Sequence, residues 1–535
     1  MDDSFENIDI KELSNRFFIN TYEIINDELY ILGNIITENI NETIKVKINN
    51  AEINTNRTYF HEKDYLKENN LFSNYFEFKF QISEDKTYDI EFESETSERL
   101  DIDFSKHCNF SKIVGYSKTK KYISILHDNT ITIQKKTSIK WLKQEFKAII
   151  NMLKGKNRQT IIVIPFRIAY LLGYPILKNK KIWFYMDRPK ISDDNGMHLF
   201  KYSVKQDPEI KKYFIISKDS QDYSKIKEIG NVLAFQSLKH RYLTLFAEHI
   251  IASHPENSVI YPFWNSFPYY AGLLKSSTTF LQHGIIKDDI STWLNKSEMN
   301  LSLFLTSAHK EYDSVFQHHY NYDENVVKLL GMPRFDNLKT EVGKKQILIM
   351  PSWRHHLKDK TSEEIIQSEL FKRFNSLINN TEFIEMAKEN NYEIIFKPHP
   401  HIYKFIDLFD TNDYVKIESE ESKYQNLFNS GSLLITDYSS VAFDFAYLKK
   451  PVIYYQYKND YHFDVETGYF KYETMGFGEV CRNEDELVNV ISGYIENDCK
   501  MEDEFIKRVN EFFRFTDRNN CKRVYEAIKE IPTKD

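Results

Sequence analysis

The chain has 535 residues, a net charge of −8, 41% hydrophobic residues and 28% charged residues. The length predicts several folding units, and the ordinary globular balance excludes a disordered or collagen-like chain. The negative charge argues against a general nucleic-acid-binding protein, so we expect no nucleic-acid partner.

The cysteine usage and the first residues indicate the compartment. The four cysteines lie far apart without a C-x-x-C pair, so we expect neither a zinc site nor a disulfide framework. The start, MDDSFENIDIKEL, is acidic and lacks the apolar core of a secretory signal. Both features favour the cytoplasm.

Residues 1–136 contain short runs in which β-branched and aromatic residues alternate with polar ones. Examples are YEIINDELYILGNI, TIKVKINN, YFEFKFQIS, TYDIEFES and KYISILHDNTITIQ. This spacing predicts an antiparallel β-sandwich. The region lacks a cluster of catalytic residue types, so we interpret it as an accessory domain.

The sequence of residues 137–158 predicts a basic amphipathic linker helix. Leu142, Phe146, Ile149, Ile150 and Leu153 share one helical face, and the many lysines stand against a single glutamate. This composition suits a helix that lies on an anionic membrane surface. The alternative is a linker helix that packs on the next domain with a solvated basic face. The candidate membrane contacts are Lys140, Lys143, Lys147 and Lys154.

The longest apolar stretch is TIIVIPFRIAYLLGYPIL, from Thr160 to Leu177. Pro165, Arg167 and Pro175 interrupt it, and it falls short of the uninterrupted run of about 20 residues that spans a bilayer. We therefore predict a buried strand followed by a turn or helix, and not a membrane span.

From residue 159 onward, apolar strands alternate with helical stretches in two series. The first includes KIWFYMD, KYFIISK, HIIAS, TTFLQHG and LSLFLTS, and the second includes KQILIMPSW, YEIIFKPHP, SLLITDYSS and PVIYYQ. Such alternation predicts parallel sheets covered by helices on both faces. The fold class is α/β, with two domains, 159–338 and 339–535, that face each other across a cleft.

Ligands of open parallel sheets bind at the carboxyl ends of the strands, so the residues that follow each strand are site candidates. His283 and Gly284 follow TTFLQ, Arg354 follows ILIMPSW, and Lys397 and His399 follow EIIF. Two cations and two imidazoles in one cleft suit a polyphosphate ester, because Arg binds two phosphate oxygens and Lys acts as a point charge.

The stretch ITDYSS joins a buried strand to a helix and places Thr436, Asp437, Ser439 and Ser440 at the helix start. Helix capping needs only one such residue. Four hydroxyl or carboxylate groups beside the positive end of a helix favour a place where an anion is held.

These motifs resemble those of a known family. MPSWR, KPHP and LLITDYSSVAFDFAYLKKPVIYYQ are similar to the signature segments of the CDP-glycerol glycerophosphotransferase family, which builds teichoic acids and some capsules. GMPRFDNL and KKIWFYMDRPKISDDNGMHLF strengthen the resemblance. It implies the GT-B architecture, with a Rossmann-like acceptor-side domain over 159–338 and a Rossmann-like CDP-donor domain over 339–535. The β-rich region lies outside the match.

The resemblance implies transfer of an alditol phosphate, with glycerol phosphate as the first candidate, from a CDP-alditol to a hydroxyl of a lipid-linked or polymeric acceptor. CMP would be released. His283 matches the histidine proposed as the base in this family, and His399 matches a second family histidine. The implied donor-binding residues are Arg354, Lys397, Thr436, Asp437, Ser439, Ser440 and Asp444. A lipid-linked acceptor implies an enzyme at the cytoplasmic face of the cell membrane.

The chain departs from the better-known polymerases at the strand-end histidine, where Gln282 replaces their usual Trp. The donor is therefore open between CDP-glycerol and CDP-ribitol or another CDP-linked group. Gly284, Lys287 and Asp288 are acceptor-side candidates, with a solvated loop as the alternative for the last two. The α/β regions carry no D-x-D motif after a strand, so we expect no metal and no cofactor.

Three other functions fit parts of the pattern. A GT-B glycosyltransferase that uses a nucleotide sugar would share the cleft but not the TDYSS segment. A sugar-nucleotide epimerase of similar architecture would need no basic surface helix. An inactive scaffold of a wall-polymer assembly would have no reason to keep His283, Arg354, Lys397 and His399 together.

Overall fold

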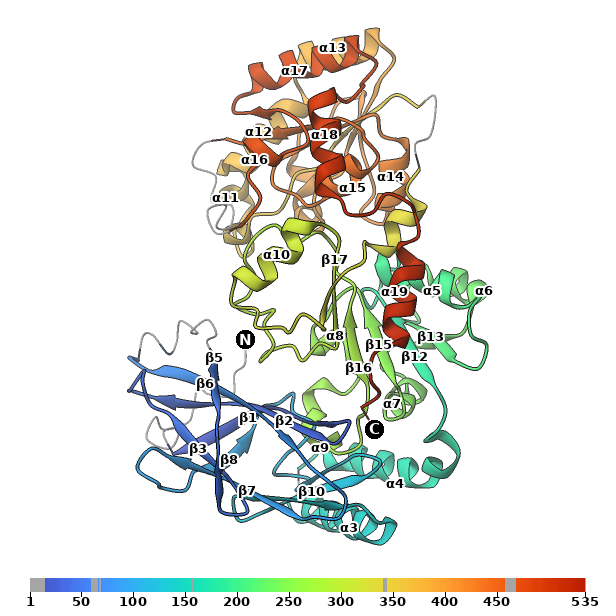
Figure 1. Ribbon diagram of the computed structural model, residues 1–535. Helices are drawn as coiled ribbons and strands as arrows, with labels where there is room; N and C mark the ends of the chain where they lie inside the picture. Colours follow the sequence, from blue (N-terminus) through green and yellow to red (C-terminus); the bar gives the residue numbers. More distant parts are fainter. Residues whose placement is uncertain are drawn as a thin grey trace.

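The computed structural model describes residues 15–58, 66, 69–155, 157–339, 344–457 and 468–534. Four β-sheets organise the described chain (Figure 1). The two N-terminal sheets lie at one side of the molecule, and two parallel sheets with their helices form the rest. We call the sheet β12–β18 with its helices the first lobe, and the sheet β19–β24 with its helices the second lobe.

The N-terminal region contains a five-stranded sheet, in the order β5-β6-β2-β1-β8, and a six-stranded sheet, in the order β4-β3-β7-β11-β10-β9. Inward side chains of both sheets, among them Phe17, Phe78 and Phe92, form one core. All pairings are antiparallel except that of β1 with β8. The strands are β1 (Arg16–Ile25), β2 (Glu28–Thr37), β3 (Ile44–Ile48), β4 (Ala51–Ile53), β5 (Asn56–Thr58), β6 (Phe72–Gln81), β7 (Tyr88–Ser94), β8 (Asp101–Phe104), β9 (Tyr116–Lys118), β10 (Tyr122–His127) and β11 (Thr130–Lys135).

Tight turns explain why these strands form hairpins. Asn26 and Asp27, between β1 and β2, have φ of 51° and 64°, and Asp128 and Asn129, between β10 and β11, have φ of 43° and 63°. Two-residue turns with positive φ at both positions match the twist of antiparallel strands, and Asn and Asp tolerate this conformation.

Helix α3 (Ser138–Lys154) follows the β region and begins at the cap Thr137, whose side chain accepts a hydrogen bond from the Lys140 N–H. The segment 137–158, predicted as a linker helix, thus contains a helix that ends at Lys154. Residues Thr160–Leu177 form one helix, α4, so the prediction of a strand at the start of this segment is wrong. A continuous apolar run is typical of both a buried strand and a buried helix, and periodicity alone does not separate them.

A buried ion pair fixes α4 to α3. The Arg167 Nε lies 2.6 Å from the Glu145 Oε1, and both side chains are 0% exposed. Arg167 also donates to the backbone carbonyl of Tyr269 at 2.7 Å, in the first lobe. Among the described residues, α4 is the one helix that is long and apolar enough to cross a membrane by length and composition, and 28% of it is buried.

The outer faces of α3 and α4 carry exposed apolar side chains, and the two helices lie together at the lower end of the molecule in Figure 1. We call this set the α3–α4 apolar surface. Its members are Ile139, Leu142, Phe146, Ile150, Leu153, Ile161, Ile162, Ile168, Leu172 and Ile176. Ile149, which the sequence placed on the same face, is buried.

The first lobe has the strand order β14-β13-β12-β15-β16-β17-β18, with every pairing parallel. The strands are β12 (Ile182–Met186), β13 (Lys211–Ile216), β14 (Val232–Ala234), β15 (His249–Ala252), β16 (Ser277–Phe280), β17 (Leu303–Thr306) and β18 (Val327–Leu329). The helices are α5 (Asn195–Ser203), α6 (Tyr223–Ile229), α7 (Leu238–Thr244), α8 (Asn257–Ile260), α9 (Phe267–Tyr270) and α10 (His309–Gln317), with 3-10 turns η1 (Trp264–Ser266) and η2 (Pro333–Asn337).

The second lobe has the strand order β21-β20-β19-β22-β23-β24, again all parallel. The strands are β19 (Gln346–Ile349), β20 (Glu393–Phe396), β21 (Val415–Ile417), β22 (Leu433–Thr436), β23 (Val452–Tyr455) and β24 (Val480–Cys481). The helices are α11 (Ser362–Gln367), α12 (Glu369–Ile378), α13 (Thr381–Glu389), α14 (Tyr424–Ser430), α15 (Val441–Tyr447), α16 (Tyr472–Met475), α17 (Glu484–Glu496) and α18 (Asp503–Phe512), with 3-10 turns η3 (His355–Leu357) and η4 (Pro400–Leu408).

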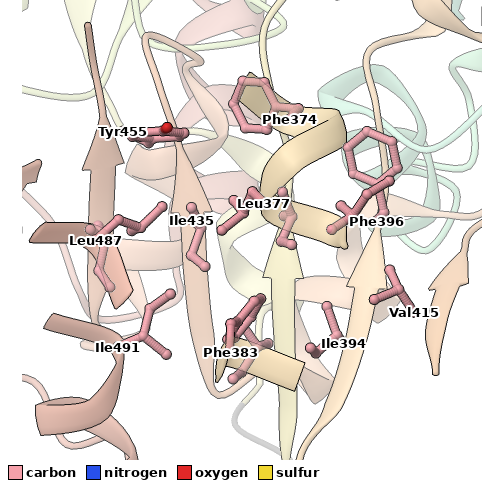
Figure 2. Close-up of a cluster of buried hydrophobic side chains, with 14 of the residues drawn as sticks. Phe374, Leu377, Phe383, Ile394, Phe396, Val415, Ile435, Tyr455, Leu487 and Ile491 are labelled. Atoms are coloured by element: carbon pink, nitrogen blue, oxygen red, sulfur yellow. The ribbon is translucent and has the colours of Figure 1, made fainter. Parts of the chain in front are cut away.

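The core of the second lobe lies between its sheet and the helices α12, α13 and α17. Figure 2 shows Ile394 and Ile435 on the strands, with Phe374, Phe383 and Leu487 from the helices packed against them. All five side chains are at most 1% exposed. Burial of this apolar surface is the main favourable contribution to folding of the lobe.

The last helix, α19 (Asn520–Lys529), leaves the second lobe and returns to the first. Its Val524 and Tyr525 share a core with Trp183 and Phe200 of the first lobe. The Asp336 carboxylate accepts from the backbone N–H groups at the helix start. The chain therefore crosses between the lobes twice, which ties them together.

Candidate active site

Three adjacent strands of the first lobe bring Arg188, His254 and His283 together, because the residues follow β12, β15 and β16 at the same edge of the sheet. The rings of His254 and His283 stack with centroids 4.3 Å apart and planes 12° apart. The Arg188 Nε lies 3.2 Å from the His254 Nε2, so the imidazole of His254 accepts this hydrogen bond in its neutral form.

The surroundings of His283 lower the pKa of its imidazole. The side chain retains solvent exposure, but the protein atoms around it desolvate the charged ring and lower the pKa below the ordinary 6.5. Arg188 and Arg334 lower it further, whereas Asp194 opposes them. Burial also lowers the pKa of His254 to about 3. A neutral imidazole at this position can accept a proton.

The backbone before His283 is held in an uncommon conformation. Gln282 has φ of 62°, its side chain is 0% exposed, and its amide donates to the Leu305 carbonyl. A non-glycine residue in the left-handed region costs free energy and persists where its surroundings fix it. The Asn195 amide holds the same turn by donating to the Gln282 carbonyl at 2.8 Å. The direction of the His283 side chain is thus set by buried contacts.

Asp187, directly after β12, organises the start of helix α5. Its carboxylate accepts from the Gly196 N–H at 2.9 Å, the Ser253 hydroxyl at 2.6 Å and the Asp194 N–H at 3.1 Å. A Cβ at Gly196 would lie 2.4 Å from the Met186 carbonyl oxygen, so only glycine fits. Burial raises the pKa of Asp187 to about 7. The carboxylate holds the β12 and β15 strand ends in one arrangement.

Arg334, from the GMPRFDNL stretch, connects the two lobes. Its guanidinium lies 2.7 Å from Asp194 at the start of α5, and 2.6 Å and 2.8 Å from the two Asp444 oxygens on α15. Burial raises the pKa of Asp444, although Arg334 opposes this. Asp444 is therefore buried and paired, and a contact with donor hydroxyls stays a prediction.

In the second lobe, the buried residues of the ITDYSS turn support its shape. Asp437 accepts from the Ser352 N–H at 2.8 Å and pairs with the Arg354 guanidinium at 2.9 Å. The Thr436 hydroxyl donates to the Met350 carbonyl at 2.7 Å. Arg354 is 1% exposed, and Thr436 and Asp437 are 0% exposed. Arg354, Thr436 and Asp437, which the sequence predicted as contacts of the donor, are therefore buried below the surface of the site, where they hold the turn in its conformation.

Lys397 and His399, after β20, differ in position. The Lys397 ammonium is buried and donates to the carbonyls of Ser419 at 2.6 Å and Glu420 at 2.9 Å. Burial lowers its pKa to about 8. His399 is half-buried, and burial together with the neighbouring His401 and Arg188 lowers its pKa to about 4. Arg188 of the first lobe therefore acts on histidines of both lobes.

The two lobes meet at Gly284 and Ser440. A Cβ at Gly284 would lie 2.6 Å from the Ser440 hydroxyl oxygen, so the strand end that carries His283 closely approaches the start of α15. Ser439 and Ser440 are half-buried and precede that helix. The structure thus brings together the predicted residues His283, Gly284, Ser439 and Ser440.

The acceptor-side candidates Lys287 and Asp288 pair with each other through the lysine ammonium and the Asp288 carboxylate. Lys287 is buried and lies over the Tyr472 ring, with its ammonium 5.8 Å from the centroid. Within the described ranges, no group of three or more His, Cys, Asp or Glu side chains is arranged to hold a metal ion.

Sequence reasoning missed four site residues: Arg188, Asp194, His254 and Arg334. Arg188 and His254 follow strands in the same way as His283, so the strand-end rule applied to every strand would have found them. Asp194 and Arg334 lie in stretches that carry the family resemblance, but their pairing joins residues 140 positions apart. Sequence spacing holds no signal for that contact.

Comparison with known proteins gives consistent matches. A model of the family described as CDP-glycerol:poly(glycerophosphate) glycerophosphotransferase matches residues 166–530. The minor teichoic acid biosynthesis protein GgaB of Bacillus subtilis (strain 168) is 45% identical over 389 residues, which cover 71% of this chain and 43% of GgaB. A teichoic acid glycerol-phosphate transferase of Staphylococcus aureus (strain NCTC 8325 / PS 47) is 29% identical over 206 residues, which cover 35% of this chain and 50% of that protein. The chain thus spans half or less of these relatives.

The fold is also that of a solved structure. The wall teichoic acid polymerase TagF superimposes with a TM-score of 0.54 and 16% sequence identity, and the alignment covers 74% of this chain and 99% of that chain. The family model includes His283, His399 and the TDYSS turn, which lie at the carboxyl ends of the parallel strands β16, β20 and β22. The chain therefore belongs to the CDP-glycerol:poly(glycerophosphate) glycerophosphotransferase family.

Proposed function

We propose that the chain transfers glycerol phosphate from CDP-glycerol to a hydroxyl of a lipid-linked or polymeric acceptor in teichoic acid synthesis. The proposal is supported by the family match over residues 166–530 and by teichoic acid transferases among its relatives. A TagF structure described with CDPG points to the same donor class. The observation that carries the proposal is geometric: His283 follows β16 directly before Gly284, the residue that closely approaches the Ser440 hydroxyl where the lobes meet.

The reaction is a displacement at phosphorus. The acceptor oxygen forms a bond to the phosphorus that carries the glycerol, the bond from that phosphorus to the bridging oxygen breaks, and CMP leaves. His283 accepts the proton of the attacking hydroxyl, which its lowered pKa permits near neutral pH. The protein otherwise contributes position and positive charge, as is general for phosphoryl transfer.

The second lobe holds the donor phosphates in this proposal. The Ser440 hydroxyl lies at the junction of the lobes, directly after Ser439, and the exposed Arg188 of the first lobe is close enough to His399 to lower its pKa. Arg354 acts through Asp437, because its ion pair fixes the turn that presents the two serines. The Lys397 ammonium likewise holds the segment after β21 by its carbonyl contacts.

The architecture in this proposal is GT-B: the first lobe is the Rossmann-like acceptor side, and the second lobe is the Rossmann-like donor side. The N-terminal β region serves as an accessory domain. It touches the first lobe through Asn109, whose amide donates to the Leu274 carbonyl at 2.6 Å, and through Ser111, whose hydroxyl donates to the Pro268 carbonyl at 2.7 Å. These contacts support a fixed placement next to α3 and α4.

The α3–α4 apolar surface lies on the cytoplasmic face of the cell membrane in this proposal, so that the enzyme reaches a lipid-linked acceptor. Ile161, Leu172 and Ile176 are 74%, 75% and 71% exposed, and burial of such side chains in the headgroup region is favourable. Lys140, Lys143, Lys147 and Lys154 are exposed on α3, where cations are attracted to anionic lipid. Association is peripheral, because Glu145 and Arg167 hold the inner faces of both helices on the protein.

A donor panel tests the function. The purified chain is incubated with a lipid-linked acceptor and one of CDP-glycerol, CDP-ribitol or a UDP-sugar, and released CMP or UDP is measured. Acceptor-dependent CMP from CDP-glycerol is expected. A preference for CDP-ribitol would identify ribitol phosphate as the transferred group, and the type of reaction would stay the same. Release of UDP alone would assign the chain to nucleotide-sugar chemistry and reject the proposal.

A further inference from the structure

His254 lies beside the proposed base and has no part in the proton transfer described above. It follows β15, and its side chain is 7% exposed, whereas that of His283 is open to solvent. The two rings stack, with centroids 4.3 Å apart and planes 12° apart. Parallel contacts between aromatic rings are favourable. One face of the exposed imidazole therefore rests on a buried ring.

The stack supplies a constraint that the backbone lacks. The buried Gln282 fixes the turn before His283, and this sets the direction in which the side chain leaves the backbone. Rotation of an imidazole about its last side-chain bond has only a broad intrinsic preference. Within the described part of the chain, the His283 ring nitrogens form no hydrogen bond that would fix this rotation. Contact with the flat His254 ring restricts it instead.

Two charged groups orient the His254 ring. The Arg188 Nε lies 3.2 Å from its Nε2 and donates the hydrogen bond, because an arginine stays protonated. The neutral ring then carries its own proton on Nδ1, which lies 3.9 Å from a carboxylate oxygen of Glu256. The ring is thus held by a donor at one nitrogen and attracted by a negative charge near the other.

The same contacts make His254 a poor base. Arg188 occupies its acceptor nitrogen, and a second proton would place two N–H groups against each other. The pKa of His254, which burial and the neighbouring His283 lower to about 3, agrees with this geometry. His254 is therefore suited to hold a neighbouring ring and not to accept a proton.

Arg188 connects this arrangement to the second lobe. Its side chain is exposed, and among the described residues its two terminal nitrogens have no hydrogen-bond partner. It is close enough to His399 of the second lobe to lower the pKa of that ring. A guanidinium carries donors on all three nitrogens, so Arg188 can keep its Nε on His254 while its terminal nitrogens bind a phosphate.

We propose that His254 is a positioning residue for the transfer: its ring holds the His283 imidazole in the orientation that accepts the proton of the attacking hydroxyl, and Arg188 holds that ring in turn. The inference rests on the proposed function, in which His283 is the base. A donor phosphate on the terminal nitrogens of Arg188 would fix the guanidinium, so donor binding and the orientation of the base are coupled.

Two substitutions separate the ring from the hydrogen bond. His254→Phe keeps a flat ring beside His283 but has no acceptor for Arg188. His254→Gln keeps an amide oxygen that can accept from Arg188 but has no ring. The matched controls are His249→Phe and His249→Gln, because His249 is a 2% exposed histidine at the start of the same strand, β15.

The stack is measured first, without substrate, by NMR of the full chain isotope-labelled at histidine Cε1. The variant His283→Gln identifies the His283 signal by its disappearance. A ring stacked on an imidazole shifts the signal of its Cε1 proton upfield. His254→Phe and both His249 controls should keep this upfield shift, and His254→Gln should lose it. An unchanged shift in His254→Gln would overturn the proposal.

Turnover and donor affinity are then measured on the folded variants. In His254→Gln, kcat should fall about 10-fold while the Kd for CDP-glycerol stays within about twofold of wild type. In His254→Phe, kcat should stay within about threefold, and Kd should rise about fivefold because Arg188 loses its anchor. A purely structural role would change both variants alike. Equal effects of the two substitutions, or a wild-type kcat in His254→Gln, would therefore overturn the proposal.

The two measurements fail separately from the proposed function. The NMR signal requires no turnover, so a wild type that releases no CMP would reject the function while the stack is still measured. A wild type that transfers glycerol phosphate, with His254 variants that behave alike, would reject only this inference. If neither His254 variant folds, Arg188→Ala replaces them, because its position is exposed. The upfield shift of His283 should weaken in that variant, and an unchanged shift would overturn the proposal.

Discussion

Replacement of Arg334 by alanine is expected to loosen the junction between the two lobes. The guanidinium makes three hydrogen bonds of 2.6 Å to 2.8 Å, one to Asp194 of the first lobe and two to Asp444 of the second. The Asp444 side chain is 3% exposed and the Asp194 side chain is 21% exposed. The variant would leave the Asp444 carboxylate buried without its cation, and the Asp194 carboxylate partly buried without its cation.

The magnitude follows from the burial. Removal of one partner from a buried ion pair costs about 3–5 kcal/mol of stability, and most of it here comes from Asp444, because Asp194 can regain water. Arg334→Lys keeps the charge but loses the planar two-pronged contact, so we expect a loss of about 1.5–3 kcal/mol. In Arg334→Met/Asp444→Leu the charge and its partner are both absent, so the loss should be smaller than in Arg334→Ala.

The assay is urea unfolding followed by circular dichroism and tryptophan fluorescence, at pH 5 and pH 8. Burial already raises the pKa of Asp444 in the wild type, and loss of Arg334 raises it further. The folded variant then binds more protons than the unfolded chain, so its stability falls as pH rises through the folded pKa. The deficit of Arg334→Ala should be smaller at pH 5 than at pH 8. A loss below about 1 kcal/mol at both pH values would refute the buried-bridge interpretation.

Three further predictions concern the site and the membrane. Arg188→Ala should move the acid limb of the pH profile of kcat/KM to higher pH, because Arg188 helps to hold the pKa of His283 below 6.5; an unmoved limb would place Arg188 away from the base. Ser440→Ala should raise the dissociation constant for CDP-glycerol about 10-fold in calorimetry, as expected for loss of a hydrogen bond to a charged group, and unchanged affinity would exclude a phosphate contact. The chain should sediment with anionic vesicles at low salt and be released at high salt. A variant in which four exposed lysines of α3 are changed to glutamate should lose this sedimentation; the changed residues are Lys140, Lys143, Lys147 and Lys154. If the variant still sediments with the vesicles, these lysines do not cause the membrane binding.

Much of the active-site edge is predictable from the sequence, because parallel strands place their following residues at one edge. His283, Gly284, Ser439 and Ser440 are close together for this reason. Alternation of strands and helices likewise predicts two parallel sheets, which the structure contains.

Side-chain direction is the part that spacing does not reveal. Arg354 and Lys397 follow strands as predicted, but both turn inward, where a carboxylate or backbone carbonyls from another segment satisfy them. These partners are close only in the folded chain. A buried cation without such partners would be costly, so the inward position and the partners depend on each other.

The helix α4 shows a different limit. Its apolar run lacks clear periodicity because one side packs on the protein while the other stays exposed and apolar. Hydrophobic patterning reveals a helix when apolar residues on one face alternate with polar residues on the other, and α4 has almost no polar face. The buried Arg167 would have been a signal, since it interrupts the run at the position that pairs with Glu145 of α3.

The most direct test of the central claim is the transfer itself, measured with CDP-glycerol labelled in the glycerol and a lipid-linked acceptor. The account predicts one labelled glycerol phosphate bound to acceptor for each CMP released. In His283→Ala the transfer rate should fall about 100- to 10,000-fold while the dissociation constant for CDP-glycerol stays within about twofold of wild type. Release of CMP without label in the acceptor, or transfer by His283→Ala at the wild-type rate, would contradict it.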